Sequence, residues 1–311
     1  RDNILWTGTI AGLSIYAPKL QKIGLLQHFE YNSKIYNNNV YYAYEDKQNT
    51  IWLGTLSSGL IKLNANNEIA KIYETIAFGE NESKAVRCLF QDSKNRFWVG
   101  TRDAGLFLFD MKNEKFTLVA SKANGQLGSN VVRSIFEDSD KNIWIGAQDG
   151  LYFLDTIANK FVHYQAETAS INNSVYQITE DPTSGNLILA SFRGGLQFFD
   201  RANRTFEIVK YDEYDSNSLS NNNIMSLAWV NSDTLLIGTY GGGLNIYSFI
   251  TKSFTHITEE DGLVNNAVYG ITYEGNGVCW LSTNDGLVRY NLRTNNFKNF
   301  SEVINVKCEL R

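Results

Sequence analysis

Short apolar runs rich in β-branched and aromatic residues occur in pairs along the chain, and each pair flanks a brief polar segment that ends in glycine. In one pair the runs are 97–101 and 106–110, and the segment between them ends at Gly105. Glycine tolerates the positive backbone φ that a tight strand reversal requires, so the pattern predicts a β-hairpin. Both runs are apolar at nearly every position, which predicts sheets covered on both faces.

The same hairpin pattern recurs near residues 4–16, 51–63, 97–110, 143–155, 187–200, 235–247 and 279–291. Its first glycine, or a small replacement, is at Gly8, Gly54, Gly100, Gly146, Ala190, Gly238 and Ser282. Its second glycine is at Gly12, Gly59, Gly105, Gly150, Gly195, Gly243 and Gly286. Tryptophan stands two residues before the first glycine at Trp6, Trp52, Trp98, Trp144 and Trp280. A period of about 40 to 50 residues is typical of propeller blades.

These repeats account for the whole chain, so we predict a single domain, 1–311, that is an all-β, seven-bladed propeller of four-stranded antiparallel blades. Inner strands ahead of the hairpins are expected to begin near Val40, Val86, Val132, Val175, Ile224 and Val268. The first hairpin has no such run before it, because the sequence begins at Arg1. We expect the strand-like tail 303–308 to pair beside that hairpin, complete the first blade and close the ring. The alternative is that the chain is cut from a longer array.

Two further positions of the repeat have structural interpretations. An aspartate follows the inner strand at Asp46, Asp92, Asp138 and Asp181, and we expect its carboxylate to accept hydrogen bonds from the amides of its own turn. The repeated tryptophan is flanked by Ile, Leu or Val, which favours packing between blades over ligand binding. Truncating such a buried side chain costs about 3–5 kcal/mol.

Charge and composition exclude several classes of function. The chain carries a formal net charge of −5, which argues against a nucleic-acid partner because phosphate binding needs a basic stripe. No apolar run reaches the 18 or so residues of a membrane span, so we expect no membrane insertion by this chain. Cys88, Cys279 and Cys308 have no metal-binding spacing and are interpreted as small buried hydrophobic residues.

The repeat itself resembles a known family. The segment Ile-Trp-Leu-Gly-Thr at 51–55, followed by Gly59 and Leu60, and the segment Ile-Trp-Ile-Gly at 143–146, followed by Gly150 and Leu151, are similar to the two-component regulator propeller repeat. The copies with Ala190 and Ser282 depart from the pattern. That repeat is found in periplasmic sensor regions of hybrid two-component systems that detect glycans. The resemblance implies a periplasmic or extracellular ligand-sensing module, with any kinase activity outside this chain.

No catalytic constellation is evident, and we predict no catalytic residues, no metal site and no cofactor. His28, His163 and His256 are expected on outer strands of different blades, where they cannot converge on one metal ion or nucleophile. Aspartates beside the hairpin glycines are explained by turn chemistry. A glycosidase needs two carboxylates within roughly 5 to 10 Å, and nothing in the sequence forces such a pair.

The remaining candidate site is the channel mouth, where the first residues of the inner strands meet the hairpin tips. Tyrosine and arginine combine a flat stacking face with hydrogen-bond donors, which suits sugars or acidic groups. The predicted ligand-binding residues are Tyr41, Arg87, Arg102, Arg133, Tyr176, Arg193, Tyr240 and Tyr269. Because the arginines come from neighbouring repeats, an anionic saccharide is the specific hypothesis. The alternative is that these side chains only fill the channel.

The leading functional hypothesis is a noncatalytic sensor propeller of a signal-transduction protein that recognises an oligosaccharide. A second hypothesis is a protein–protein interaction scaffold that docks a neighbouring propeller or a second copy of the chain. A polysaccharide lyase or hydrolase is a third. Fold alone does not decide among them.

Overall fold

The computed structural model describes residues 5–9, 12–17, 22–26, 28–31, 34–37, 40–166 and 173–300, with side chains described at Tyr31 and from residue 40 onward. This part of the chain consists of β-strands joined by turns and loops, with one short helical turn at Glu259–Asp261. The all-β prediction is therefore confirmed.

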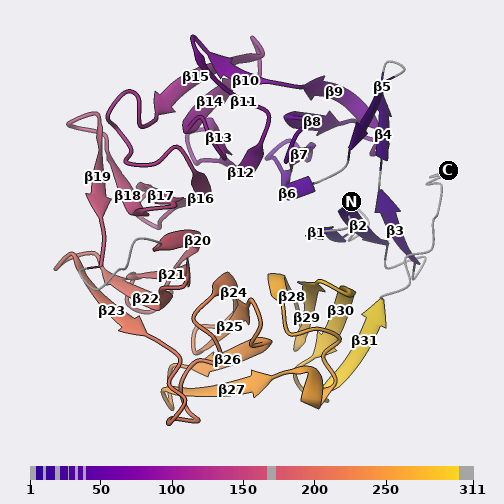
Figure 1. The fold of residues 1–311 in the computed structure, drawn as a ribbon, viewed down its shortest axis with the longest axis vertical. Helices are drawn as coiled ribbons and strands as arrows, with labels where there is room; N and C mark the ends of the chain where they lie inside the picture. Colours follow the sequence, from indigo (N-terminus) through magenta and orange to yellow (C-terminus); the bar gives the residue numbers. More distant parts are fainter. Residues whose placement is uncertain are drawn as a thin grey trace. The chain divides into compact units, whose positions relative to one another are not determined.

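Six sheets have four antiparallel strands each, and in every one the strands follow one another in sequence order (Figure 1). The first two are β6–β9 (Val40–Glu45, Ile51–Thr55, Leu60–Leu63, Ile69–Tyr73) and β12–β15 (Val86–Gln91, Phe97–Thr101, Leu106–Asp110, Lys115–Ala120). The next two are β16–β19 (Val132–Glu137, Ile143–Ala147, Gly150–Asp155, Lys160–Tyr164) and β20–β23 (Ser174–Glu180, Leu187–Phe192, Gly195–Asp200, Thr205–Val209). The last two are β24–β27 (Ile224–Asn231, Thr234–Thr239, Leu244–Ser248, Ser253–Ile257) and β28–β31 (Val268–Gly275, Val278–Thr283, Gly286–Asn291, Asn296–Phe300). These are the four-stranded blades of a β-propeller.

The first repeat differs: within the described residues six four-stranded blades are formed and not the predicted seven. Strands β1 (Leu5–Thr9), β2 (Gly12–Ala17) and β3 (Lys22–Leu26) make a sheet of three described strands. The tail 303–308, which we expect to complete this sheet, lies outside the described residues.

Two small hairpins are inserted between blades. One pairs β4 (His28–Tyr31) with β5 (Lys34–Asn37), and the other pairs β10 (Ile76–Phe78) with β11 (Asn81–Ser83). His28 was predicted on the outer strand of the first sheet. It lies instead in the first of these hairpins, because the outer strand ends earlier, at Leu26.

The chain divides into two compact units. The first holds the described residues up to Glu137 together with Leu154–Val162, and the second holds Asp138–Phe153 and the described residues from His163 onward. The prediction of one domain over 1–311 stays a prediction.

Close approach of consecutive sheets explains the first glycine of the repeat. A Cβ atom built on Gly100 of β13 would lie 2.7 Å from Cγ1 of Val132, the first residue of β16, and 2.3 Å from Sγ of Cys88. Gly54 and Gly238 meet Val86 and Val268 in the same way, at 2.8 and 2.9 Å. Real Cβ atoms do not tolerate such distances, so this position needs glycine or a local rearrangement.

The tryptophans fill the space beside these contacts, as predicted. Trp52 is 1% exposed, and its ring centroid lies 5.1 Å from that of Phe97 and 5.7 Å from that of Phe109, both in the next sheet. Trp144 contacts Phe199 of a neighbouring sheet at 5.7 Å. Aromatic pairs in such tilted or edge-on arrangements stabilise a core beyond the area they bury.

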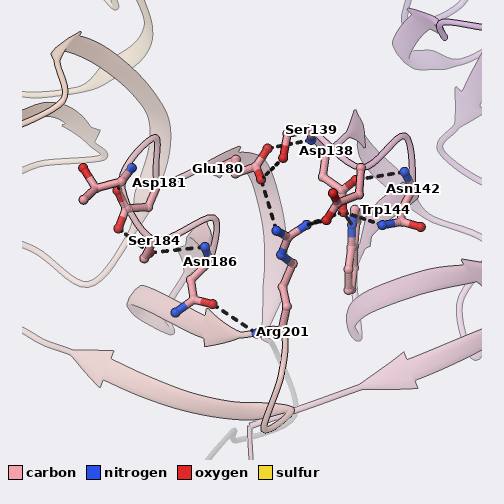
Figure 2. A network of polar contacts seen from close by, with 11 residues as sticks. Asp138, Ser139, Asn142, Trp144, Glu180, Asp181, Ser184, Asn186 and Arg201 are labelled. Carbon is pink, nitrogen blue, oxygen red and sulfur yellow. Dashed lines mark hydrogen bonds and ion pairs between the residues drawn. The ribbon is translucent and has the colours of Figure 1, made fainter.

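The aspartate turns join neighbouring sheets as well as closing their own. Asp46 Oδ1 accepts the amides of Gln48 and Thr50 at 2.9 and 2.8 Å, as predicted. In the next two repeats, the residue after the aspartate bonds to a glutamate of the following inner strand. Ser93 donates through N and Oγ to Glu137, at 2.8 and 2.6 Å. Ser139 does the same to Glu180, at 2.7 and 2.6 Å (Figure 2).

In the second unit an arginine reinforces this junction. Arg201 Nη1 donates to Asp138 Oδ2 at 2.8 Å, and its Nη2 lies 3.3 Å from Glu180 Oε1 (Figure 2). Asp140 adds a third carboxylate at 3.2 Å. One guanidinium thus ties the turn after β16 to the end of β20.

Hairpin tips and inter-blade connectors lie at the same end of the sheets. The amide of Gly105 donates to Asn130 O at 3.0 Å, and the amide of Gly195 donates to Asn222 O at 3.1 Å. Each acceptor belongs to the connector that leads into the next inner strand. The first residues of the inner strands and the hairpin tips are therefore neighbours, and this end carries the candidate site.

Candidate functional site

A β-bulge sits at the second or third residue of every inner strand whose pairing is described. In β12, Val86 pairs with Thr101 and Cys88 pairs with Gly100, so Arg87 is the extra residue between them. The residues in the equivalent place are Tyr41 in β6, Tyr176 in β20, Met225 in β24 and Tyr269 in β28. A bulge leaves one residue outside the ladder and changes the direction of its side chain, and bulges are common beside functional sites.

The bulge follows from the packing of the residue before it. Val86, Val132, Val175, Ile224 and Val268 are fully buried. The glycine contacts described above hold several of them against the preceding sheet. In regular alternation the next residue would point to the opposite face, toward the following sheet. The bulge places that residue outside the ladder and changes the direction of its side chain. Four of the eight predicted site residues occupy these bulges.

In the first unit, the bulge residues of two neighbouring inner strands contact each other. The guanidinium carbon of Arg87 lies 4.7 Å from the ring centroid of Tyr41, which is a cation–π contact. Tyr41 is 46% exposed, so one side of this pair remains open to solvent. Arg87 Nε is buried and has no hydrogen-bond partner.

The other two predicted residues of this unit lie nearby in the fold. Arg102 is exposed at the tip between β13 and β14, and its amide donates to Ala85 O at 3.0 Å. Arg133 is the half-buried second residue of β16, at the place equivalent to Arg87 in β12. Strands β6, β12 and β16 follow one another side by side.

In the second unit, four aromatic rings form a continuous row, made by two bulge residues and two residues at hairpin tips. The ring centroids of Tyr176 and Phe192 are 5.6 Å apart, those of Phe192 and Tyr240 are 6.4 Å apart, and those of Tyr240 and Tyr269 are 5.9 Å apart. Tyr240 is 45% exposed. The row therefore presents aromatic surface to solvent along β20, β24 and β28, which are neighbouring inner strands (Figure 1).

Polar groups flank this row. The guanidinium carbon of Arg193 lies 5.8 Å from the ring centroid of Phe192, and the Arg193 amide donates to Asn223 Oδ1 at 3.1 Å. Tyr269 Oη donates to Asn284 Oδ1 at 2.8 Å. Burial, followed by the nearby Tyr240 hydroxyl, raises the pKa of Tyr269, so its hydroxyl is a neutral donor at physiological pH.

The structure thus brings the predicted residues together in two groups, one in each unit. Tyr41 and Arg87 are in direct contact, as are Tyr240 and Tyr269, whereas Tyr176 and Arg193 are linked through Phe192. The sequence places Phe192 at a hairpin tip of the channel mouth but not among the predicted ligand-binding residues, and Asn284 was omitted. Both occupy the hairpin tip position of Arg102 and Tyr240, so the repeat register was the signal that could have found them.

The histidines and acids do not assemble into a reaction centre in the residues that the structure describes. His163 stacks on Tyr152 at 4.3 Å, and His256 Nε2 lies 2.8 Å from Ser218 O. Across the described ranges, no three His, Cys, Asp or Glu side chains are placed as metal ligands would be. The described part also contains no helix of the length and apolarity that crossing a membrane would require.

Comparison with known families finds a match in three segments of the chain. Residues 37–57, 81–103 and 126–149 match the family described as two component regulator propeller. These segments are similar to that family. The matched segments cover the first three aspartate turns and the inner strands before them. They contain Tyr41, Arg87, Arg102 and Arg133. No curated protein sequence matches this chain.

Solved structures that match this chain include proteins of two bacteria. PorZ, a surface component of the type-IX secretion system of Porphyromonas gingivalis, is 15% identical with a TM-score of 0.68, over 93% of this chain and 44% of that one. Extracellular domains of BT4673 and BT3049 of B. thetaiotaomicron, described as hybrid two component systems, are each 17% identical. Their TM-scores are 0.47 and 0.43, over 96% and 95% of this chain and 53% and 55% of theirs. The chain therefore spans about half the length of these structures.

Proposed function

We propose that the chain is a noncatalytic ligand-sensing propeller of a signal-transduction protein, and that it recognises an oligosaccharide. The observation that carries the proposal is the row Tyr176, Phe192, Tyr240 and Tyr269, in which bulges and hairpin tips supply successive rings. Aromatic faces stack on the apolar faces of sugar rings, and tyrosine hydroxyls donate to sugar oxygens. Arg193 and Asn284 add polar groups at its side.

The regulator propeller repeat supports a sensing role and a periplasmic or extracellular location. Any kinase activity would belong to a segment outside this chain. A ligand that binds the folded chain shifts its unfolding equilibrium in proportion to its affinity. The chain itself needs no reacting groups to report such binding.

Thermal unfolding and calorimetry with a panel of neutral and acidic oligosaccharides test this function. We expect at least one oligosaccharide to raise the melting temperature, and we expect Tyr240→Ala and Tyr269→Ala to weaken its binding by about tenfold or more, since aromatic stacking contributes on the order of 1–3 kcal/mol. Tyr214→Ala is the matched control, because Tyr214 is 90% exposed and lies outside the row.

Three outcomes would overturn the proposal. One is the absence of any shift across the panel. Another is an equal effect of the Tyr214, Tyr240 and Tyr269 variants. The last is turnover of a polysaccharide by the purified chain, detected as new reducing ends, because that would make the protein an enzyme.

We further propose that 303–308 completes the first blade and closes a seven-bladed ring. Among the described strands β1 pairs only with β2, so its other edge is available for pairing. An unpaired apolar edge is an aggregation hazard that closure removes. Deleting 303–308 should lower the melting temperature and promote association, and a deletion without effect would exclude this pairing.

A second candidate function is a scaffold that docks a second copy of the chain. Ile157 is 99% exposed at the turn between β18 and β19. The same turn lines a groove of about 300 Å³ whose walls include Leu118, Leu154 and Phe161. A protruding Ile157 beside an apolar groove makes a self-complementary patch, as a two-fold dimer requires. Sedimentation should then show a dimer that Ile157→Ser dissociates, and a monomer at high concentration would exclude it.

A further inference from the structure

The first unit contains an arginine that is stacked but not paired with an acid. Three other arginines have carboxylate partners: Arg96 Nε lies 2.5 Å from Asp92, Arg201 Nη1 lies 2.8 Å from Asp138, and Arg289 Nε lies 3.6 Å from Glu274. In the described ranges no ion pair involves Arg87, whose Nε is buried without a hydrogen-bond partner. Keeping a partly desolvated cation without a counter-charge costs free energy, and a bound anion would offset that cost.

We infer that Arg87 is the main contact of a site for an acidic group, a carboxylate or a sulfate ester, carried by a sugar ligand. The inference rests on the proposed sensing function for its biological role, but the site is defined by the first unit alone. Its residues are Tyr41, Arg87, Arg102 and Arg133.

The Tyr41 ring holds the guanidinium in place for such a contact. The ring centroid lies 4.7 Å from the guanidinium carbon, so the ring covers one side of this group, and N–H donors that do not face the ring are left for a ligand. Such donors match the two oxygens of a carboxylate or two oxygens of a sulfate. Because Arg87 is the bulged residue of β12, its side chain is directed by the bulge rather than by ladder pairing.

Neighbouring residues make this place basic within an acidic chain. Arg102 is attached through its amide to Ala85, two residues before Arg87, and Arg133 holds the equivalent place in the next inner strand. Lys84 precedes them in the connector, and Asp103 is the one acid within 84–87, 101–104 and 131–134. These three sequence stretches contain four cations and one acid, whereas the whole chain carries −5.

The experiment uses calorimetry on the full chain with a trigalacturonate and its methyl ester. The two probes have the same sugar rings, and only the first has free carboxylates. We expect the acid to bind at least tenfold more tightly than the ester, with an affinity that falls as salt is raised. A sulfated chondroitin disaccharide tests the sulfate ester as the acidic group. The tighter binder of the trigalacturonate and the disaccharide identifies whether the site prefers a carboxylate or a sulfate.

Variants locate the contact. Arg87→Ala should weaken acid binding by about 10- to 100-fold, the usual loss for a charge-assisted hydrogen bond, and should leave ester binding unchanged. Arg87→Lys should give an intermediate affinity, because it keeps the charge but not the bidentate geometry. Lys115→Ala is the control, since Lys115 is an exposed cation on the outer strand β15 of the same blade. Melting temperatures equal to that of the parent chain show that the variants are folded.

Two results would overturn the inference. Either the acids bind no more tightly than the ester, or Arg87→Ala leaves acid binding unchanged. Failure of the sensing proposal gives a different result. If Tyr240→Ala removes neutral oligosaccharide binding while Arg87→Ala changes nothing, the sensing proposal is supported and the acidic-group site is excluded. If Arg87→Ala removes acid binding while no oligosaccharide depends on the aromatic row, the acidic-group site is supported and ligand binding by the row is excluded.

Discussion

Trp144 donates an indole hydrogen bond of 2.8 Å to the carboxylate of Asp138, six residues earlier in the chain (Figure 2). The same spacing joins Trp52 to Asp46, Trp98 to Asp92 and Trp280 to Glu274, at 2.8, 2.9 and 2.9 Å. In the aspartate turns the same carboxylate also holds backbone amides of its own turn. A core side chain and a surface turn are therefore fixed by a single acid.

Removing that acid should destabilise the fold where a tryptophan depends on it. Asp92 is fully buried and accepts bonds from the Trp98 indole and from Arg96. Asp92→Ala leaves these donors without a partner, so we expect a loss of about 2–4 kcal/mol in the free energy of unfolding, measured in urea.

The fifth repeat offers a matched control for that variant. Asp181 holds the equivalent place but its repeat has Ile188 instead of tryptophan, and its carboxylate serves Thr183 N and Ser184 Oγ in an exposed turn. Asp181→Ala should cost only about 0.5–1 kcal/mol. Equal losses at Asp92 and Asp181 would show that the indole bond contributes nothing.

Stability should fall with acid in a predictable range of pH. Burial by itself would raise the pKa of Asp138, but hydrogen bonds from Trp144, Asn142 and Arg201 outweigh it and hold that pKa below its usual value. Asp92 behaves similarly, with Trp98 and Arg96 as donors. A carboxylate with a lowered folded pKa stabilises the fold above its unfolded pKa of about 4, and this contribution is lost as the pH falls through the folded value.

Urea titrations from pH 7 to pH 3 measure this loss. The unfolding free energy of the parent chain should decline below about pH 4, and that of Asp138→Asn should decline less because one titrating group is gone. Parallel pH profiles for the two proteins would contradict the assignment.

A methyl group at the inter-blade glycine should disturb the packing. The Cβ of Gly100→Ala would meet Cys88 Sγ at 2.3 Å and Val132 Cγ1 at 2.7 Å, so we expect a loss of about 1–3 kcal/mol in thermal or urea unfolding. Gly270→Ala is the control, because its Cβ would meet only Ser282 Oγ, at 3.0 Å. A Gly100→Ala variant as stable as Gly270→Ala would mean that the two sheets separate easily.

Two ion pairs between sheets should contribute different amounts to the free energy of unfolding, because their side chains differ in exposure. The Arg201 side chain is 20% exposed and its partner Asp138 is fully buried, whereas Lys71 and Glu114 pair with side chains 44% and 42% exposed. Arg201→Met should cost about 1.5–3 kcal/mol, and Lys71→Met at most about 1 kcal/mol. Raising the salt concentration should weaken only the Lys71 pair appreciably, and the opposite order of losses would contradict this account.

Much of the fold could be predicted from the sequence because each repeat carries its own local signals. Gly105 and Trp98 mark a hairpin and its core face, and Val86 marks the start of an inner strand. The hydrogen bond from the tryptophan indole to the turn aspartate was not predicted. The two residues are six positions apart on either side of a turn, and neither the helix period nor the strand period extends across a turn. The number of complete blades depends on pairing with residues far along the chain, which a local pattern does not determine.

The candidate site was predicted in part, through the repeat register. Tyr41, Arg87, Tyr176 and Tyr269 are the residues after the Val or Ile that starts each inner strand, and each of them is the bulged residue of its strand. No sequence rule predicts such a bulge, which follows a residue buried against the preceding sheet. Contacts such as the Arg87–Tyr41 stack depend on two neighbouring blades and appear only in three dimensions.

Because each bulged residue stands outside the hydrogen-bond ladder, its identity is uncoupled from the folding of its blade. Tyrosine, arginine and methionine already share this place in one chain, at Tyr41, Arg87 and Met225. Retargeting the protein to another molecule would then require exchanging only these side chains, one blade at a time, while the scaffold beneath them keeps its stability.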